Sequence, residues 1–263
     1  MKNALYRTLL PLLLVLAMGS CSEDGDINVF SIEQDLKLGQ QADAEIRSKP
    51  SEFPILDPAD HPQAYAYLQG MVDEIVEKGM VPYADVFPYD VAIIDQDVEN
   101  AFATPGGFLY VYTGLILALE TEDELAGVLA HEIAHSAERH STDQLTQQFG
   151  LSTLLSLITG GADPGLISQV AGSLLTLSFS RGDETEADER SVDYLCNTQY
   201  AANGAAGFFE SIQDGPSPPE FLSTHPNPDN RVEAINQRAA DKGCSTETGS
   251  QERFRTFKDN LME

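Results

Sequence analysis

The stretch VLAHEIAHSAERH, residues 128–140, holds three of the five histidines in this 263-residue chain. His131 and His135 are four residues apart, so on a helix with about 3.6 residues per turn both imidazoles lie on one side. Two neutral imidazole nitrogens on one side can bind the same metal ion. Glu132 points about 100° around the helix axis, where its carboxylate can accept a proton from the attacking water. This HExxH arrangement predicts a zinc site on a helix.

The residues around the motif favour a helix. Thr121 is a candidate N-cap, and Glu124 follows three residues later, as a capping box requires. An apolar stripe continues from there into the motif. His140 lies five residues beyond His135, off the metal-binding side. We therefore interpret His140 as a positive charge near the C-terminal end of the helix.

The segment SFSRGDETEADERSVDYL, residues 178–195, offers several acids for a third ligand. Glu184 and Asp188 are four residues apart and share one side of a helix, whereas Glu186 is about 200° from Glu184 and faces water. We predict that Glu184 binds zinc. Asp188 is predicted to accept a hydrogen bond from the free ring nitrogen of a ligand histidine, which fixes the tautomer of that ring. Read alone, Asp188 is equally well explained as a solvated charge.

Four blocks together resemble one enzyme family. The motif HEIAH and the following SRGDETEAD are preceded by NAFATPGGFLYVYTGLI and followed by THPNPDNRV, within residues 100–232. Their content and order resemble the HtpX and CAAX prenyl protease family of zinc metallopeptidases, especially its soluble, lipid-anchored bacterial periplasmic members. The resemblance implies an α+β, mainly helical fold: a single metallopeptidase domain with a small sheet whose edge strand lies above the HExxH helix.

The resemblance also assigns roles to residues. It makes His131, His135 and Glu184 the ligands of one zinc ion per chain, and Glu132 the catalytic base. His225 and Arg231 match family candidates for stabilising the developing oxyanion, although alone they would be residues of a turn and a helix start. Two roles stay open for His225: its imidazole either fills the open coordination position and keeps the enzyme latent, or donates a hydrogen bond to the oxyanion.

Two further segments alternate apolar and polar residues as strands do: YDVAIID, residues 89–95, and FLYVYTG, residues 108–114. Between them, TPGG at residues 104–107 supplies a tight turn. The resemblance makes the second strand the sheet edge above the active helix, where the backbone of an extended peptide can pair with it. A plain hairpin has the same sequence signature. The residues expected to contact substrate are Gly106, Gly107, Phe108, Leu109, Tyr110 and Val111.

The apolar run over residues 149–179 is broken by GGADPG, so each half is too short to span a bilayer. It predicts two helices packed in the core; a membrane-facing hairpin over the cleft is the alternative. Helical periodicity is also found in four other segments, namely residues 31–48, 61–79, 201–213 and 228–241.

The first 21 residues, MKNALYRTLLPLLLVLAMGSC, have a basic start and a short apolar run typical of an export signal. The ending AMGSC resembles a bacterial lipobox, which predicts lipidation of Cys21; an ordinary signal peptide is the alternative. Ser22 favours the outer membrane by analogy with known bacterial sorting. We expect a lipid-anchored periplasmic protein with a signal peptide at 1–20, a tether at 21–30, a metallopeptidase domain at 31–245 and a tail at 246–263.

The net charge limits the possible partners of the protein, and its cysteines indicate the compartment in which it works. The net charge of -27 argues against nucleic acid as a partner. Cys196 and Cys244 form an even pair suited to an oxidising periplasm, and the sequence leaves open whether they form a disulfide. The function expected is a zinc endopeptidase that cleaves unfolded or misassembled envelope proteins. A noncatalytic, chaperone-like binder of extended envelope polypeptides is the alternative, although it would not need Glu132.

Overall fold

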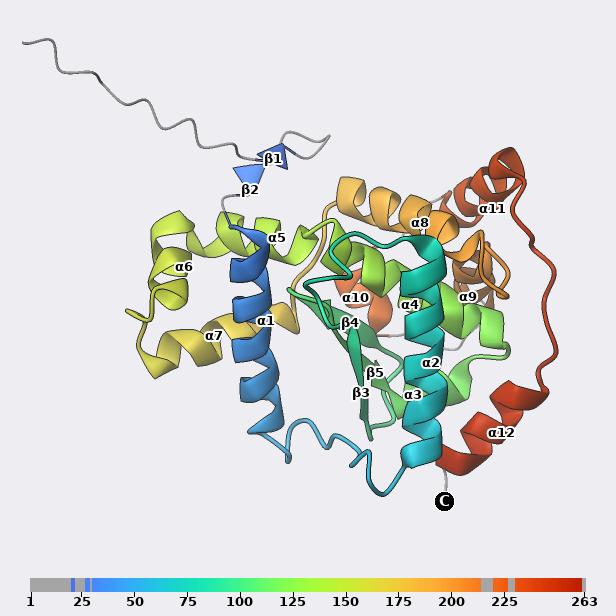
Figure 1. The fold of residues 1–263 in the computed structure, drawn as a ribbon, viewed down its shortest axis with the longest axis horizontal. Helices are drawn as coiled ribbons and strands as arrows, with labels where there is room; N and C mark the ends of the chain where they lie inside the picture. The colour runs from blue at the N-terminus through green and yellow to red at the C-terminus, as the bar shows by residue number, and fades with distance from the viewer. Residues whose placement is uncertain (1–19, 22–26, 29, 214–219, 227–229, 262–263) are drawn as a thin grey trace, which may run out of the picture.

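The computed structural model describes residues 20–21, 27–28, 30–213, 220–226 and 230–261. These residues form a mainly helical molecule with one small three-stranded sheet (Figure 1). The expected α+β, mainly helical fold class is confirmed. Residues 1–19, where the export signal is expected, lie outside the described residues. Within the described ranges, no helix combines the length and apolar character needed to cross a bilayer.

The helix α4 (Glu122–Ala137) contains the HExxH motif and lies at the centre of the molecule, with all of its residues buried. Its predicted capping box is confirmed: the Thr121 hydroxyl accepts a hydrogen bond from the backbone N–H of Glu124, and the Glu124 carboxylate bonds the Thr121 backbone N–H. Two further helices, α8 (Arg181–Leu195) and α9 (Gly204–Gln213), pack along α4. A Cβ atom on Gly127 would lie 2.0 Å from the backbone of Ala205, so only glycine permits this close approach of α4 to α9.

The three-stranded sheet has the order β3–β5–β4, formed by β3 (Asp90–Ile94), β4 (Ala101–Thr104) and β5 (Phe108–Tyr112). β5 pairs in parallel with β3 and antiparallel with β4. The hairpin therefore joins β4 to β5, and its turn places Gly106 and Gly107 at φ values of 79° and 85°, which glycine adopts readily.

The expectation that β5 forms the edge above the active helix is wrong. β5 is the central strand of this sheet, so the backbone over Phe108–Val111 is paired on both sides. The strand beside α4 is β4, whose Ala103 backbone hydrogen-bonds the carboxylate of Glu132. β4 could not be predicted from the sequence, because four residues next to a turn are too few for a clear alternation.

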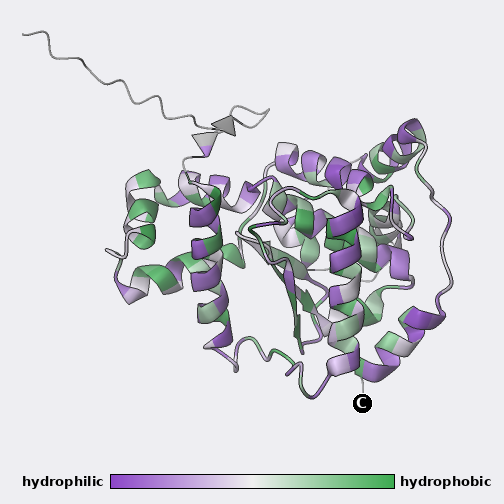
Figure 2. Ribbon diagram, in the orientation of Figure 1, coloured by the Kyte–Doolittle hydropathy of each residue, from purple (hydrophilic) through white to green (hydrophobic). Residues whose placement is uncertain are grey.

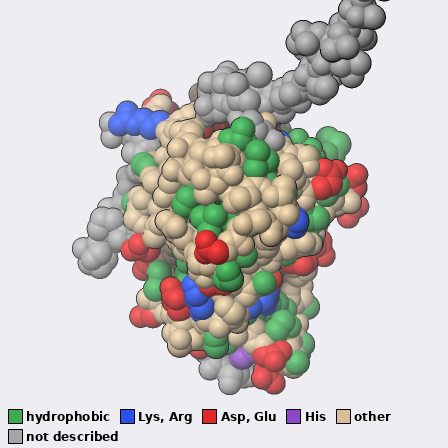
Figure 3. All heavy atoms as spheres, turned by 90° about the vertical axis from the view of Figure 1, so that its left-hand side faces the viewer, with side chains coloured by type: hydrophobic (Ala, Val, Ile, Leu, Met, Phe, Trp, Pro, Cys, Tyr) green, Lys and Arg blue, Asp and Glu red, His purple; other side chains and the backbone are tan. Residues whose placement is uncertain are grey.

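A second group of helices packs beside the sheet: α1 (Ile32–Arg47), α5 (His140–Phe149), α6 (Leu151–Ile158) and α7 (Pro164–Leu174). The apolar run therefore forms two helices, as predicted, and their green faces in Figure 2 contribute a cluster shared with α1. Residues 150–180 contain one ionisable residue, Asp163. The face that these helices turn outward shows mainly backbone and uncharged polar side chains, with scattered hydrophobic side chains and an acidic side chain near its centre (Figure 3).

Both ends of the described chain are held against the domain. The strands β1 (Ser20–Cys21) and β2 (Ile27–Asn28) pair with each other, and Arg139 donates hydrogen bonds to the Asn28 side chain and the Phe30 carbonyl. At the other end, α12 (Glu252–Leu261) packs on α2 (Pro62–Gly79) and α3 (Thr113–Ala118). Phe254 and Phe257 of α12 are buried, so much of the segment expected as a tail belongs to the domain.

Candidate active site

The structure brings four buried side chains together: His131 and His135 from α4, Glu184 from α8, and His225. His225 directly follows the short helix α10 (Phe221–Thr224). One donor atom from each of the four lies within 4.8 Å of the other three. The first three are the residues predicted as zinc ligands, and the fourth is the loop histidine whose role the sequence left open.

The hydrogen-bonding chemistry of this cluster fits a zinc ion. Nδ1 of His131 lies 3.0 Å from Oδ1 of Asp188, so in the neutral form of the ring, which is the form that binds metal, the hydrogen sits on Nδ1 and the lone pair is on Nε2. That Nε2 lies 3.0 Å from Nε2 of His135, and each of these two nitrogens lies 3.5 Å from a Glu184 oxygen. Electron pairs gathered so closely repel one another unless a cation lies between them. Imidazole and carboxylate donors of this kind suit zinc.

The protein's own groups shift the pKa values of the cluster. Burial lowers the pKa of His131, but hydrogen bonds to Asp188 and Glu184 outweigh it and raise that pKa to about 9. For His135, the effect of burial exceeds that of the contact with Glu184, so the pKa lies well below its usual value. Burial raises the pKa of Glu184, but the charge of His225 and hydrogen bonds from the histidines outweigh it and hold that pKa well below its usual value. Glu184 is therefore anionic, the form that binds metal.

Asp188 and Arg231 contact two members of the cluster, His131 and Glu184. Arg231 donates two hydrogen bonds to Asp188, of 2.7 and 2.6 Å, and its Nη1 lies 3.0 Å from Oε2 of Glu184. Its guanidinium also lies over the Phe209 ring, 3.9 Å from the centroid. Among the described residues, the ion pairs of the buried Arg231 thus all go to Asp188 and Glu184.

Glu132 lies between the cluster and the sheet. Its Oε1 is 3.3 Å from Nε2 of His225, on the opposite side of that ring from Glu184. Burial raises the pKa of Glu132, while the charges of His225 and His131 and the backbone hydrogen bond from Ala103 act in the opposite direction. A carboxylate with a raised pKa is better suited to accept and return a proton near neutral pH.

His225 is held in place by the elements around it. Its ring stacks on Phe221 with 4.2 Å between centroids, and its Nδ1 lies 3.0 Å from Glu184 and 3.3 Å from Nε2 of His131. The backbone of α10 is tied to its neighbours, because Thr224 accepts a hydrogen bond from the N–H of Phe179. The ring therefore lies in the ligand cluster and leaves 1% of its surface exposed.

His140 differs from our prediction. The helix α4 ends before Arg139, which has a left-handed backbone with φ of 67°, and His140 begins α5 and turns back toward the site. It is buried, and its Nδ1 lies 2.9 Å from Nδ1 of His135. Glu186 is also not a purely water-facing residue, because its carboxylate contacts His140. Neither contact could be predicted from helix periodicity, because that prediction requires the helix to continue past Arg139.

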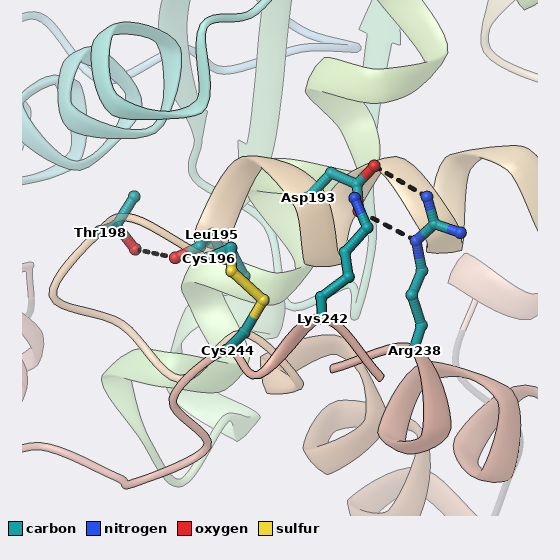
Figure 4. Close-up of a disulfide and its surroundings, with 7 residues drawn as sticks. All are labelled: Asp193, Leu195, Cys196, Thr198, Arg238, Lys242 and Cys244. Carbon is teal, nitrogen blue, oxygen red and sulfur yellow. Dashed lines mark hydrogen bonds and ion pairs between the residues drawn. A yellow bond between two sulfur atoms is a disulfide. The ribbon is translucent and has the colours of Figure 1, made fainter. Parts of the chain in front are cut away.

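The other residues singled out from the sequence lie outside the cluster. Gly106 and Gly107 are in the β4–β5 turn, residues 108–111 are in the central strand, and Cys21 is in β1. Cys196 and Cys244 form a disulfide that joins the end of α8 to the end of α11 (Arg231–Lys242) (Figure 4). The disulfide that the sequence left open therefore ties the helix bearing Glu184 to the helix bearing Arg231.

Comparison with known proteins agrees with this geometry. The model of peptidase family M48 matches residues 62–239, more than half of the chain. The putative beta-barrel assembly-enhancing protease of Vibrio cholerae is 29% identical over 230 residues, which cover 81% of this chain and 45% of that protein. The beta-barrel assembly-enhancing protease of Yersinia pestis is 32% identical over 168 residues, covering 58% of this chain and 35% of that protein.

A eukaryotic relative is similar over more of its own length. The mitochondrial metalloendopeptidase OMA1 of Schizosaccharomyces pombe is 28% identical over 229 residues, covering 84% of this chain and 66% of that protein. By contrast, the present chain spans less than half the length of the two bacterial relatives. The residues matched by the family model include the motif helix and the segment that supplies Glu184.

Proposed function

Because this chain belongs to peptidase family M48, whose members are zinc-dependent metallopeptidases, we propose that it cleaves unfolded or misassembled proteins of the bacterial cell envelope. The observation that carries the proposal is the convergence of His131, His135 and Glu184 at distances of 3.0 to 3.5 Å. We assign these three residues as the ligands of one zinc ion. When bound there, zinc acts as a Lewis acid that lowers the pKa of water and polarises the scissile carbonyl.

Glu132 is the proposed general base. It adjoins the ligand cluster but is not one of the four clustered donors, and its raised pKa lets it take a proton from the attacking water. The same carboxyl group then returns the proton to the leaving amine. A protein that only bound polypeptides would need no acid at this position, so the intact Glu132 favours the peptidase over the chaperone-like alternative.

His225 is proposed to block the site in the conformation described. Its Nδ1 is one of the four clustered donor atoms, and its Nε2 faces the proposed base, so the ring occupies the space between Glu132 and the ligands. A water that attacks the substrate needs this space. The blocking role is therefore better supported than the oxyanion role, and activity requires His225 to move away.

Arg231 is proposed to position the ligands and to leave the oxyanion to other groups. Its contacts with Asp188 and Glu184 use the guanidinium inside the protein, where it fixes the carboxylate that orients His131.

We propose that substrate pairs with the edge strand β4, and not with β5 as expected from the sequence. The β4 backbone adjoins Glu132 through Ala103, so a peptide paired along this strand would lie beside the base.

The compartment is proposed from separate observations. A disulfide between Cys196 and Cys244 suits an oxidising environment such as the periplasm. The bacterial relatives are named for assembly of beta-barrels, which supports envelope proteins as substrates. We also propose that the chain is most similar in kind to lipid-anchored members of the HtpX and CAAX prenyl protease family. On this proposal residues 1–20 are removed, Cys21 is lipidated, and the protein is attached to the outer membrane.

The test compares envelope proteomes of cells that produce the wild type or Glu132→Gln at equal levels. Envelope proteins that accumulate only with the variant, together with cleavage of the same proteins by the purified wild type, support the proposal. Glu189→Gln, which changes a half-exposed acid on α8, is the matched control. Equal proteomes, together with no cleavage of these proteins by the purified, zinc-loaded wild type, would leave the noncatalytic binder as the better account.

A further inference from the structure

A chain of polar contacts leads from His135 to the surface of α8. Nδ1 of His135 lies 2.9 Å from Nδ1 of His140, and Nε2 of His140 lies 3.5 Å from Oε2 of Glu186. Glu186 is in turn held by Arg190, whose Nη2 lies 3.3 Å from the other carboxylate oxygen. His135 and His140 are buried, and Glu186 is partly buried.

These contacts allow one arrangement of hydrogens for neutral rings. A ligand histidine must present a lone pair at the nitrogen that faces the metal, which is Nε2 in His135. Its hydrogen is therefore on Nδ1 and is donated to Nδ1 of His140. His140 then has its own hydrogen on Nε2, on the side of the Glu186 carboxylate. Each of the two rings therefore has one nitrogen that donates a hydrogen and one nitrogen that offers a lone pair.

We propose that His140 is a positioning residue that, with Glu186, fixes the tautomer and orientation of His135 for metal binding. The inference rests on the proposed function, since it takes His135 as a zinc ligand. Both ligand histidines are then supported by carboxylates of the same helix: Asp188 bonds His131 directly, and Glu186 reaches His135 through His140. Mutation of a residue that hydrogen-bonds a metal ligand typically lowers metal affinity by about 10- to 100-fold.

A packing role alone makes a different prediction. The Phe179 ring stacks on His135 at 3.9 Å and lies 6.3 Å from His140, so an aromatic ring at position 140 would preserve the packing. Phenylalanine fills that space but accepts no hydrogen bond. Glutamine is smaller, yet its amide oxygen can accept from His135 while its NH₂ group donates to Glu186. The two substitutions therefore separate hydrogen bonding from packing.

The experiment measures zinc dissociation constants by chelator competition at one pH for the wild type, His140→Phe and His140→Gln. We expect the Phe variant to bind zinc at least about tenfold more weakly and the Gln variant to stay within about threefold of the wild type. Glu186→Ala should weaken binding severalfold on its own and have no further effect in a His140→Phe background, because it acts through His140. Wild-type affinity of a folded His140→Phe protein would overturn the inference, as would equal losses with Phe and Gln.

A second readout keeps the test decisive if a variant fails to fold. In the zinc-loaded wild type, ¹⁵N NMR of the histidine rings should find the His135 hydrogen on Nδ1 and the His140 hydrogen on Nε2. The opposite tautomer of either ring would contradict the proposal. If the proposed zinc site is wrong, Glu184→Ala will keep its normal zinc content. If only the inference about His140 is wrong, Glu184→Ala will lose zinc, but substitutions of His140 will leave zinc affinity unchanged.

Discussion

Nε2 of His225 lies 3.3 Å from Oε1 of Glu132, so a loop histidine directly faces the proposed catalytic base. With its Nδ1 among the clustered donors, the ring fills the space where substrate and water meet in the proposed mechanism. We predict that His225→Ala raises basal cleavage of casein severalfold at equal zinc content. A fall of about a hundredfold would instead identify His225 as an oxyanion donor, and unchanged activity would assign it a structural role.

Replacement of the base should separate zinc binding from catalysis. Glu132→Gln keeps the size of the side chain but accepts no proton, so we expect normal zinc content, normal folding and a loss of peptide cleavage of about a thousandfold or more. Turnover of an unfolded substrate by the purified variant gives the answer. Cleavage near the wild-type rate would mean that another group takes the proton.

Removal of the carboxylate ligand should remove the metal. Glu184 has no surface exposure and contacts both proposed ligand histidines, so we expect Glu184→Ala to lose most of the proposed one zinc ion per chain. Elemental analysis of the purified protein provides the measurement, and Glu189→Ala on the same helix is the control. If the Glu184 variant retained stoichiometric zinc, the ligand assignment would have to be abandoned.

The ion pairs of Asp193 should give the stability a defined pH dependence. Burial raises the pKa of Asp193, but hydrogen bonds from Arg238 and Lys242 outweigh it and lower the pKa overall. The side chains of all three residues are drawn in Figure 4. A lowered folded-state pKa stabilises the protein above the unfolded-state value near 4, and this contribution is lost as the pH falls through the folded-state value.

We therefore predict that Asp193→Asn lowers the free energy of unfolding by up to about 1 kcal/mol at pH 7, the usual range for partly exposed ion pairs. The difference from the wild type should shrink as the pH falls below about 4. Urea titrations of both proteins at several pH values measure it. A difference that stayed constant with pH would show that the substitution acts through packing.

The sequence by itself determined the local features of this protein. The HExxH spacing, the capping box of Thr121 and Glu124, and the two helices within the apolar run depend on residues close together in the chain, where helix geometry fixes the neighbours. The shared side of Glu184 and Asp188 follows from the same geometry. The family resemblance then connected these segments across residues 100–232.

Only the tertiary structure decided which distant groups meet. Strand order depends on pairing between separate segments, so β5 could not be recognised as the central strand before β4 was placed against it. The contact of His140 with His135 requires the left-handed turn at Arg139, which helix periodicity does not predict. Likewise, Arg231 faces Asp188 because α11 packs on α8, a long-range contact that leaves no periodic signal in the sequence.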